Sequence, residues 1–144
     1  MTPEVLYGAW EYQAWQIRYE DGRCSSPFGL SASGLLLYTA DGYMSATIMA
    51  AGRPLLSHAN PRLASLEEKA AAFDSYFTYA GRWYVEGDRV VHEVTLALNA
   101  GLMGTPQWRD AHLQGNRLVL SAREKTKTGE RQHSLTWVRR LEGQ

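Results

Sequence analysis

Turns that contain glycine recur along the chain and divide much of it into short segments. Four of these turns are Asp41-Gly42, Glu86-Gly87-Asp88, Gln114-Gly115-Asn116 and Thr128-Gly129-Glu130. Each contains the glycine that a positive φ angle in a tight turn requires. Aromatic residues, which favour strands, make up 11% of the chain. This pattern predicts an antiparallel all-β protein.

The segments between turns predict eight strands. We expect them at residues 9–19, 33–39, 43–50, 80–86, 89–98, 106–113, 117–124 and 131–140. A sheet of eight strands closes into a barrel that is filled by its own side chains or holds one small ligand. The length of 144 residues fits one domain with one core. We therefore predict a single eight-stranded antiparallel β-barrel over residues 1–144.

One segment between the third and fourth predicted strands has a helical pattern. In SLEEKAAAFDSYFTYAG, residues 65–81, Ser65 and Glu68 form a capping box. An apolar stripe with helical spacing follows at Leu66, Ala70, Phe73 and Phe77. We predict a helix that ends before Gly81 and that caps or flanks the mouth of the barrel.

The composition argues against several classes of function. Lys plus Arg and Asp plus Glu number 15 each, so no strong positive field favours nucleic acid or an anionic membrane. Cys24 is the only cysteine, and the histidines occur singly, so we expect no disulfide and no metal site. The sequence contains no phosphate-binding glycine loop, so we expect no cofactor. No secretion signal or apolar run long enough for a membrane is present, so we expect a cytoplasmic protein.

Alternation along the strands predicts which residues point into the barrel, because residues two apart share a face. The sets expected inside are Trp10, Tyr12, Ala14 and Gln16, then Leu36 and Tyr38, then Gly81, Trp83 and Val85, then Val90, His92, Val94, Leu96 and Leu98. In the sixth strand, either Gln107 and Arg109 or Trp108 faces inward. With Gln107 and Arg109 inside, the interior is apolar with a few polar groups, which is typical of a small-molecule site.

Two of these inward residues have alternative roles. His92 is either a hydrogen-bonded core residue or a general acid or base. Arg109 needs a partner if it is buried. That partner is Glu93 or Asp110 if the alternation is shifted, and a ligand carboxylate or enolate oxygen if it is not. The candidate ligand-binding residues are Tyr12, Leu36, Tyr38, Tyr43, Trp83, His92, Val94, Gln107 and Arg109.

Several stretches resemble a known family. Gly8-x-Trp10 and the basic pair Arg139-Arg140 resemble the lipocalin superfamily, in which a tryptophan closes one barrel end and an arginine stacks on it. GLLLYTADGYMSA, FDSYFTYAGRWYV, VVHEV and GTPQWRDAHLQGNRLVLS together resemble the lipocalin-like domain family of small bacterial and fungal proteins. Positions that match the family pattern are Tyr38, Tyr43, Met44, Ser45, Gly81, His92, Gln107 and Arg109. Leu98-Asn99-Ala100 departs from it, because family members often have Pro-Asn-Trp there.

The resemblance implies a lipocalin-like barrel with a central cavity and no single reaction. Our first hypothesis is that the barrel binds a small hydrophobic or aromatic metabolite. The second is a cofactor-free cyclase, isomerase or dehydratase of secondary metabolism that uses His92, Arg109 and Tyr38 as catalytic residues. The third is a filled barrel that forms a homodimer through surface residues such as Trp15 and Trp108.

Overall fold

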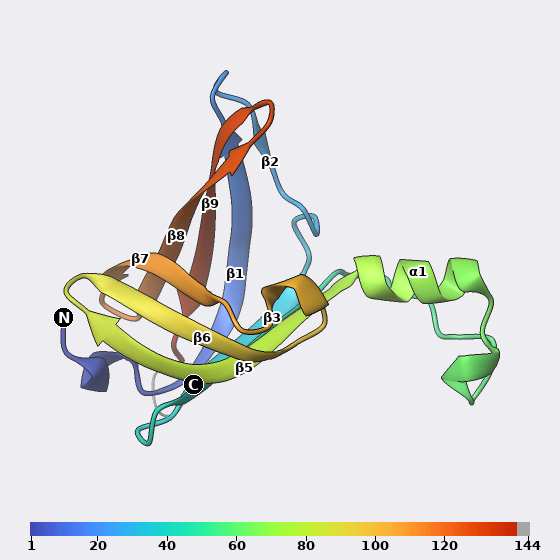
Figure 1. The fold of residues 1–144 in the computed structure, drawn as a ribbon, viewed down its shortest axis with the longest axis horizontal. Helices are drawn as coiled ribbons and strands as arrows, with labels where there is room; N and C mark the ends of the chain where they lie inside the picture. The colour runs from blue at the N-terminus through green and yellow to red at the C-terminus, as the bar shows by residue number, and fades with distance from the viewer. Residues whose placement is uncertain (141–144) are drawn as a thin grey trace.

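The computed structural model describes residues 1–140, which are mostly strands (Figure 1). The strands are β1 (Gly8–Tyr19), β2 (Cys24–Ser25), β3 (Ser33–Tyr38), β4 (Tyr43–Met49), β5 (Tyr76–Glu86), β6 (Arg89–Ala97), β7 (Pro106–Gln114), β8 (Arg117–Thr126) and β9 (Gly129–Val138). The helices are α1 (Leu66–Asp74) and the 3₁₀ turns η1 (Pro3–Leu6), η2 (Pro61–Leu63) and η3 (Ala100–Leu102). No helix within residues 1–140 has both the length and the apolar character needed to cross a membrane.

The eight long strands form a closed antiparallel barrel. They pair in the order β1, β3, β4, β5, β6, β7, β8 and β9, and β9 pairs with β1 to complete the ring. The short β2 pairs with the far end of β1, where Ile17 faces Ser25. The predictions of an all-β fold, of eight barrel strands and of one helix between the third and fourth of them are confirmed.

The helix is shorter than the sequence pattern predicts. The capping box is present, because the Ser65 hydroxyl accepts from the Glu68 backbone N–H and the Glu68 carboxylate accepts from the Ser65 N–H. The helix ends at Asp74, and Phe77 lies in β5. Helical and strand patterns overlap in this apolar segment, and hydrogen bonding to β4 places it in the sheet.

The helix also does not cap the barrel mouth, contrary to our expectation. Figure 1 shows α1 extending away from the barrel, beyond the first residues of β5. None of its residues is buried. The helix is held by its capping box and by hydrogen bonds from the preceding loop, where the Ser57 backbone N–H donates to the Glu68 carboxylate over 2.8 Å and the Arg53 Nη2 donates to the Ala72 carbonyl over 3.1 Å.

Two β-bulges change which residues face the interior. In β1 the register shifts between Tyr12 and Ala14, so Trp15 and Ile17 point inward and Gln16 is exposed. A second shift between Ala80 and Gly81 of β5 leaves Leu96 of β6 68% exposed. The predicted inward positions of Gln16 and Leu96 are therefore wrong, because a bulge inserts one residue and reverses the alternation beyond it.

One end of the barrel is filled by side chains. Trp10 and Leu6 are fully buried there, and the Trp10 indole Nε1 donates to the Leu6 carbonyl over 3.0 Å. The Arg139 guanidinium stacks on the Trp10 ring at 4.1 Å, as the resemblance implies for one residue of the basic pair. Arg140 instead binds the Glu11 carboxylate. This packed end closes the barrel on one side of the cavity described below.

Candidate functional site

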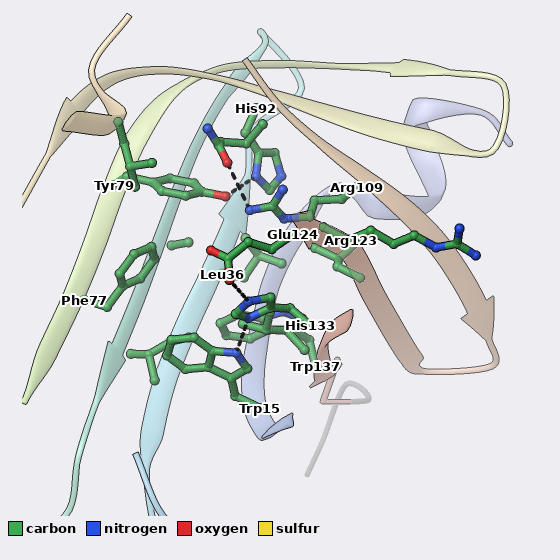
Figure 2. Close-up of a pocket in the computed structure, with 17 residues that line it drawn as sticks. Trp15, Leu36, Phe77, Tyr79, His92, Arg109, Arg123, Glu124, His133 and Trp137 are labelled. Carbon is green, nitrogen blue, oxygen red and sulfur yellow. Dashed lines mark hydrogen bonds and ion pairs between the residues drawn. The ribbon is translucent and has the colours of Figure 1, made fainter. Parts of the chain in front are cut away.

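A cavity of about 300 Å³ lies inside the barrel beyond its packed end (Figure 2). Its apolar wall comes from several strands and includes Trp15, Leu36, Ile48, Phe77, Leu135 and Trp137. Its polar wall consists of Tyr79, His92, Gln107, Arg109, Arg123, Glu124 and His133. A mainly apolar, concave site with a few convergent polar groups is typical of small-molecule binding sites.

His92 lies between two tyrosine hydroxyls. Its Nε2 is 2.6 Å from the Tyr38 hydroxyl, and its Nδ1 is 2.7 Å from the Tyr79 hydroxyl. All three side chains are buried, and of the three only His92 and Tyr79 line the cavity. The three groups come from β3, β5 and β6, so this hydrogen-bonded chain also links three strands across the barrel.

Burial and the nearby Arg109 guanidinium lower the pKa of His92 to about 3. Burial also raises the pKa of Tyr38 well above its usual range, and it raises the pKa of Tyr79 while Arg109 acts in the opposite direction. At pH 7 the imidazole is therefore uncharged and both phenols keep their protons. A histidine in this state is a weak proton acceptor and is poorly suited to act as the general base considered from the sequence.

The low pKa of His92 predicts that stability falls with acidity. An unfolded histidine binds a proton below pH 6.5 or so, whereas native His92 does not until about pH 3, so the unfolded state binds more protons in this window. Below pH 6 we expect the free energy of unfolding to fall by up to about 1.4 kcal/mol per pH unit through this group alone. Urea unfolding between pH 4.5 and 7 measures this slope. His92→Gln should reduce the slope, and the matched variant His112→Gln, at an exposed histidine, should not.

Arg109 projects from β7 into the cavity, and Gln107 holds it. The Arg109 Nη2 donates to the Gln107 Oε1 over 3.3 Å, and its Nη1 donates to the Trp108 carbonyl over 2.9 Å. Gln107 is fixed in turn by donating to the Thr105 hydroxyl. None of the ion pairs formed within residues 1–140 includes Arg109. This arginine therefore brings a positive charge into the cavity without a carboxylate from the described chain.

The structure settles which face of β7 lies inside the barrel, a point that the sequence left open. Gln107 and Arg109 face the cavity, and Trp108 is on the outer surface with 40% of its area exposed. Asp110 also points outward, where its carboxylate binds Arg89 at 3.3 Å. Asp110 is therefore not the partner of Arg109.

The cavity meets the outer surface between β7 and β8. Within residues 1–140, the pairing of these strands ends at Asp110 and Ser121. Beyond that pair β7 continues along β6, while β8 continues along β9. Arg109 and Ala122 line both the cavity and a hollow on the outside of this gap. Arg109 therefore lies between the cavity and the outer hollow at this gap.

A second polar group lies on β8 and β9, on the side of the cavity away from the packed end. The Trp15 Nε1 donates to the His133 Nδ1 over 3.2 Å, and the His133 Nε2 lies 3.4 Å from the Glu124 carboxylate (Figure 2). Glu124 also pairs with Arg131 at 3.2 Å. Because Nδ1 accepts the indole N–H, neutral His133 carries its proton on Nε2 and donates it to Glu124.

The structure brings four of the predicted ligand-binding residues to the cavity wall. These are Leu36, His92, Gln107 and Arg109. Tyr38, Trp83 and Val94 are buried beside the cavity. The Trp83 ring packs on the Tyr38 ring at 4.5 Å, so it supports the hydrogen-bonded chain from behind.

Tyr12 and Tyr43 lie elsewhere. Tyr12 is half-buried and packs edge-on against Trp137 at 5.9 Å. Tyr43 is 51% exposed on the outer surface, where the Arg82 guanidinium lies over its ring at 4.6 Å. The expectation that Tyr43 faces the cavity beside Tyr38 is wrong, because alternation in β4 turns Met44 inward and Tyr43 outward.

Sequence reasoning missed most residues of the cavity wall, among them Trp15, Phe77, Tyr79, Glu124 and His133. Tyr79 and Phe77 were assigned to the helix, and Trp15 was hidden by the bulge in β1. Glu124 and His133 could have been found from the sequence. Counting every second residue from Leu118 and from Trp137 reaches them on the inward face.

The described residues contain no cluster that fits a metal ion. Within residues 1–140, no group of three or more His, Cys, Asp or Glu side chains converges at ligand distance. The polar groups of the cavity are instead arranged as hydrogen-bonded pairs and chains.

The closed eight-stranded antiparallel barrel and its internal cavity define a lipocalin-like β-barrel protein. The chain belongs to the lipocalin-like domain family, whose model matches residues 7–140. This confirms the resemblance seen in the sequence.

Comparison with known proteins gives further similarities. The crystal structure of lipoprotein YedD from Klebsiella pneumoniae subsp. pneumoniae MGH 78578 is 11% identical, with a TM-score of 0.41 over 96% of this chain and 75% of that one. The crystal structure of rhizavidin is 13% identical, with a TM-score of 0.39 over 99% and 92% of the two chains. No curated protein shows significant sequence similarity to the chain.

Proposed function

We propose that this protein binds a small molecule whose hydrophobic or aromatic body lies in the cavity against Trp15, Phe77 and Trp137. The observation that carries this proposal is the cavity itself, a mainly apolar chamber of about 300 Å³ into which Arg109 projects without an ion-pair partner among residues 1–140. Aromatic walls bind flat apolar groups through both burial and ring contacts.

The ligand that fits this site is therefore small, with a hydrophobic or aromatic body and room for one polar end near Arg109. Within residues 1–140 no carboxylate pairs with that arginine, so the polar end of the chamber is available to a ligand. The hydrogen bonds that Arg109 donates to the Gln107 side-chain oxygen and the Trp108 carbonyl hold the guanidinium in place before any ligand binds. Such preorganisation favours affinity, because less side-chain freedom is lost on binding.

The state of His92 supports binding over acid–base catalysis. With its pKa lowered to about 3, the imidazole is a weak base, and both of its nitrogens are already engaged by Tyr38 and Tyr79. An efficient general base needs a pKa nearer the working pH and access to the substrate proton. Trp15 lies in the cavity wall, so only Trp108 of the two tryptophans considered for a homodimer is on the outside.

Titration with N-phenyl-1-naphthylamine, an uncharged apolar probe whose fluorescence rises in apolar surroundings, tests the proposal. We expect saturable enhancement with one probe per chain. Ala122→Phe should weaken binding of the probe at least about tenfold, because a phenyl ring at this position occupies part of the cavity. The matched control is Ala51→Phe, at an exposed turn, which should bind as the wild type does.

Two results would contradict a binding function in the cavity. One is the absence of saturable enhancement in a folded protein. The other is equal probe binding by the wild type and Ala122→Phe, with circular dichroism showing that both are folded, because the probe would then bind outside the cavity.

A further inference from the structure

The hydrogen-bonded chain of Tyr38, His92 and Tyr79 has an unequal supply of donors and acceptors. Burial keeps the imidazole neutral, so one of its nitrogens carries a proton and the other accepts one. One tyrosine must therefore donate its hydroxyl hydrogen to His92, while the other accepts the N–H. The tyrosine that accepts keeps a hydroxyl hydrogen that needs a different acceptor.

Burial decides which tyrosine donates to His92. The Tyr38 hydroxyl is enclosed, it does not reach the cavity, and within residues 1–140 its hydrogen-bond partner is His92 Nε2. If Tyr38 accepted from His92, its own hydrogen would be buried without a partner, which is unfavourable. Tyr38 therefore donates to Nε2, the proton of His92 is on Nδ1, and Nδ1 donates to the Tyr79 oxygen. The Tyr79 hydroxyl hydrogen is then free to point into the cavity.

The nearest charged group to this hydroxyl cannot accept its hydrogen. Arg109 has N–H donors only, and the Gln107 and Trp108 oxygens use two of its five N–H groups. Figure 2 shows the Arg109 guanidinium next to the Tyr79 hydroxyl, so the remaining donors of Arg109 and this hydroxyl lie in the same part of the cavity. Donors that converge around one space are complementary to an acceptor with negative charge.

We propose that Tyr79 and Arg109 together bind a carboxylate of the ligand, and that Tyr38 and His92 act as positioning residues that direct the Tyr79 hydroxyl toward it. The ligand class is then a small aromatic or alicyclic carboxylic acid. Its ring lies against the apolar wall, and its carboxylate receives hydrogen bonds from the phenol and the guanidinium. This inference rests on the proposed binding function and specifies the polar end of the ligand.

A matched pair of ligands tests the inference. 1-Naphthoate and uncharged 1-naphthamide share an aromatic body and differ in the carboxylate. Both are used to displace N-phenyl-1-naphthylamine, and direct calorimetry gives their dissociation constants. We expect the carboxylate to bind about 10- to 100-fold more tightly than the amide, because hydrogen bonds to a charged group contribute more than neutral ones.

Variants locate the origin of that preference. Tyr79→Phe and Arg109→Gln should each remove most of the preference for 1-naphthoate over 1-naphthamide. The preference is a ratio measured within each variant, so a general change in binding to the cavity cancels. Tyr84→Phe removes a hydroxyl from an exposed tyrosine of the same strand and should keep the full preference. Arg109→Lys should keep part of it, because a lysine retains the charge but not the planar donor fork.

The proton position on His92 provides a readout that does not depend on ligand affinity. Nitrogen-15 NMR of the histidine ring should show the Nδ1–H form in the ligand-free protein. Tyr38→Phe removes the donor that favours the Nδ1–H form, so we expect the Nε2 resonance to shift and the preference for 1-naphthoate to fall. A role in packing alone would leave the ring nitrogen shifts unchanged.

The possible outcomes separate this inference from the proposed function. If the uncharged probe binds in the cavity but the two naphthyl compounds bind equally, or neither displaces it, the carboxylate site is wrong and the binding function stands. An Nε2–H form in the ligand-free protein would also overturn the assignment of Tyr79 as the donor. If the probe does not bind in the cavity at all, both proposals fail.

Discussion

Replacement of Gly81 by alanine is expected to lower the free energy of unfolding by at least about 3 kcal/mol. A Cβ atom at this position would lie 1.8 Å from the Glu93 carbonyl oxygen and 3.1 Å from the Thr95 backbone nitrogen. These are backbone atoms of the neighbouring strand, so they can move only if the β5–β6 pairing opens. Urea unfolding followed by circular dichroism measures the change.

The consequence of this substitution extends to the cavity. Along β5, the bulge at Ala80 and Gly81 lies between Tyr79 and Trp83, and Trp83 pairs with His92 of β6. Opening β5 from β6 at the bulge therefore separates the Tyr79 hydroxyl from His92. Gly101→Ala is the matched control, because the nearest atom to an added Cβ there is the side-chain oxygen of Asn99 at 3.2 Å. A Gly81→Ala protein as stable as this control would show that the close approach of the two strands does not constrain the barrel.

Replacement of Trp10 by alanine is expected to lower the free energy of unfolding by about 3–5 kcal/mol. The indole is fully buried at the packed end of the barrel, its N–H donates to the Leu6 carbonyl, and the Arg139 guanidinium covers its ring. The substitution therefore leaves a large cavity, an unpaired carbonyl and a cation without its aromatic partner. Chemical unfolding at pH 7 provides the measurement.

Trp108→Ala is the control for this second substitution. Trp108 has the same side chain on the outside of the barrel, 40% exposed, and we expect its removal to change the free energy of unfolding by no more than about 1 kcal/mol. Equal losses for the two variants would mean that burial at the packed end does not determine the stability of the barrel.

Local patterns in the sequence were sufficient to predict much of the fold. The turns at Gly42, Gly87, Gly115 and Gly129 all have glycine with a positive φ angle, and each joins two strands of the barrel. Turn chemistry and alternation are local properties, so they can be read without knowledge of distant contacts. The same alternation correctly placed His92 on the inward face of its strand.

The errors arose where distant contacts override local pattern. The segment that contains Phe77 and Tyr79 has apolar spacing compatible with a helix, but its backbone groups pair with β4 and β6. The bulge in β1 depends on how β1 pairs with β9, at the other end of the chain, and it turns Trp15 into the cavity. Neither event has a distinct signal in the residues concerned, because pairing partners are chosen in three dimensions.

The sequence by itself determined the type of fold and the inward position of His92, and the family resemblance implied the tryptophan–arginine contact at the packed end. The sequence left the orientation of Arg109 open. Only the tertiary structure decided that Tyr38 and Tyr79 bind the two nitrogens of His92, and that the pairing of β7 and β8 ends beside Arg109. The physical reason is that alternation fixes the face of a strand on which a side chain lies, whereas barrel closure and bulges fix which side chains from different strands meet.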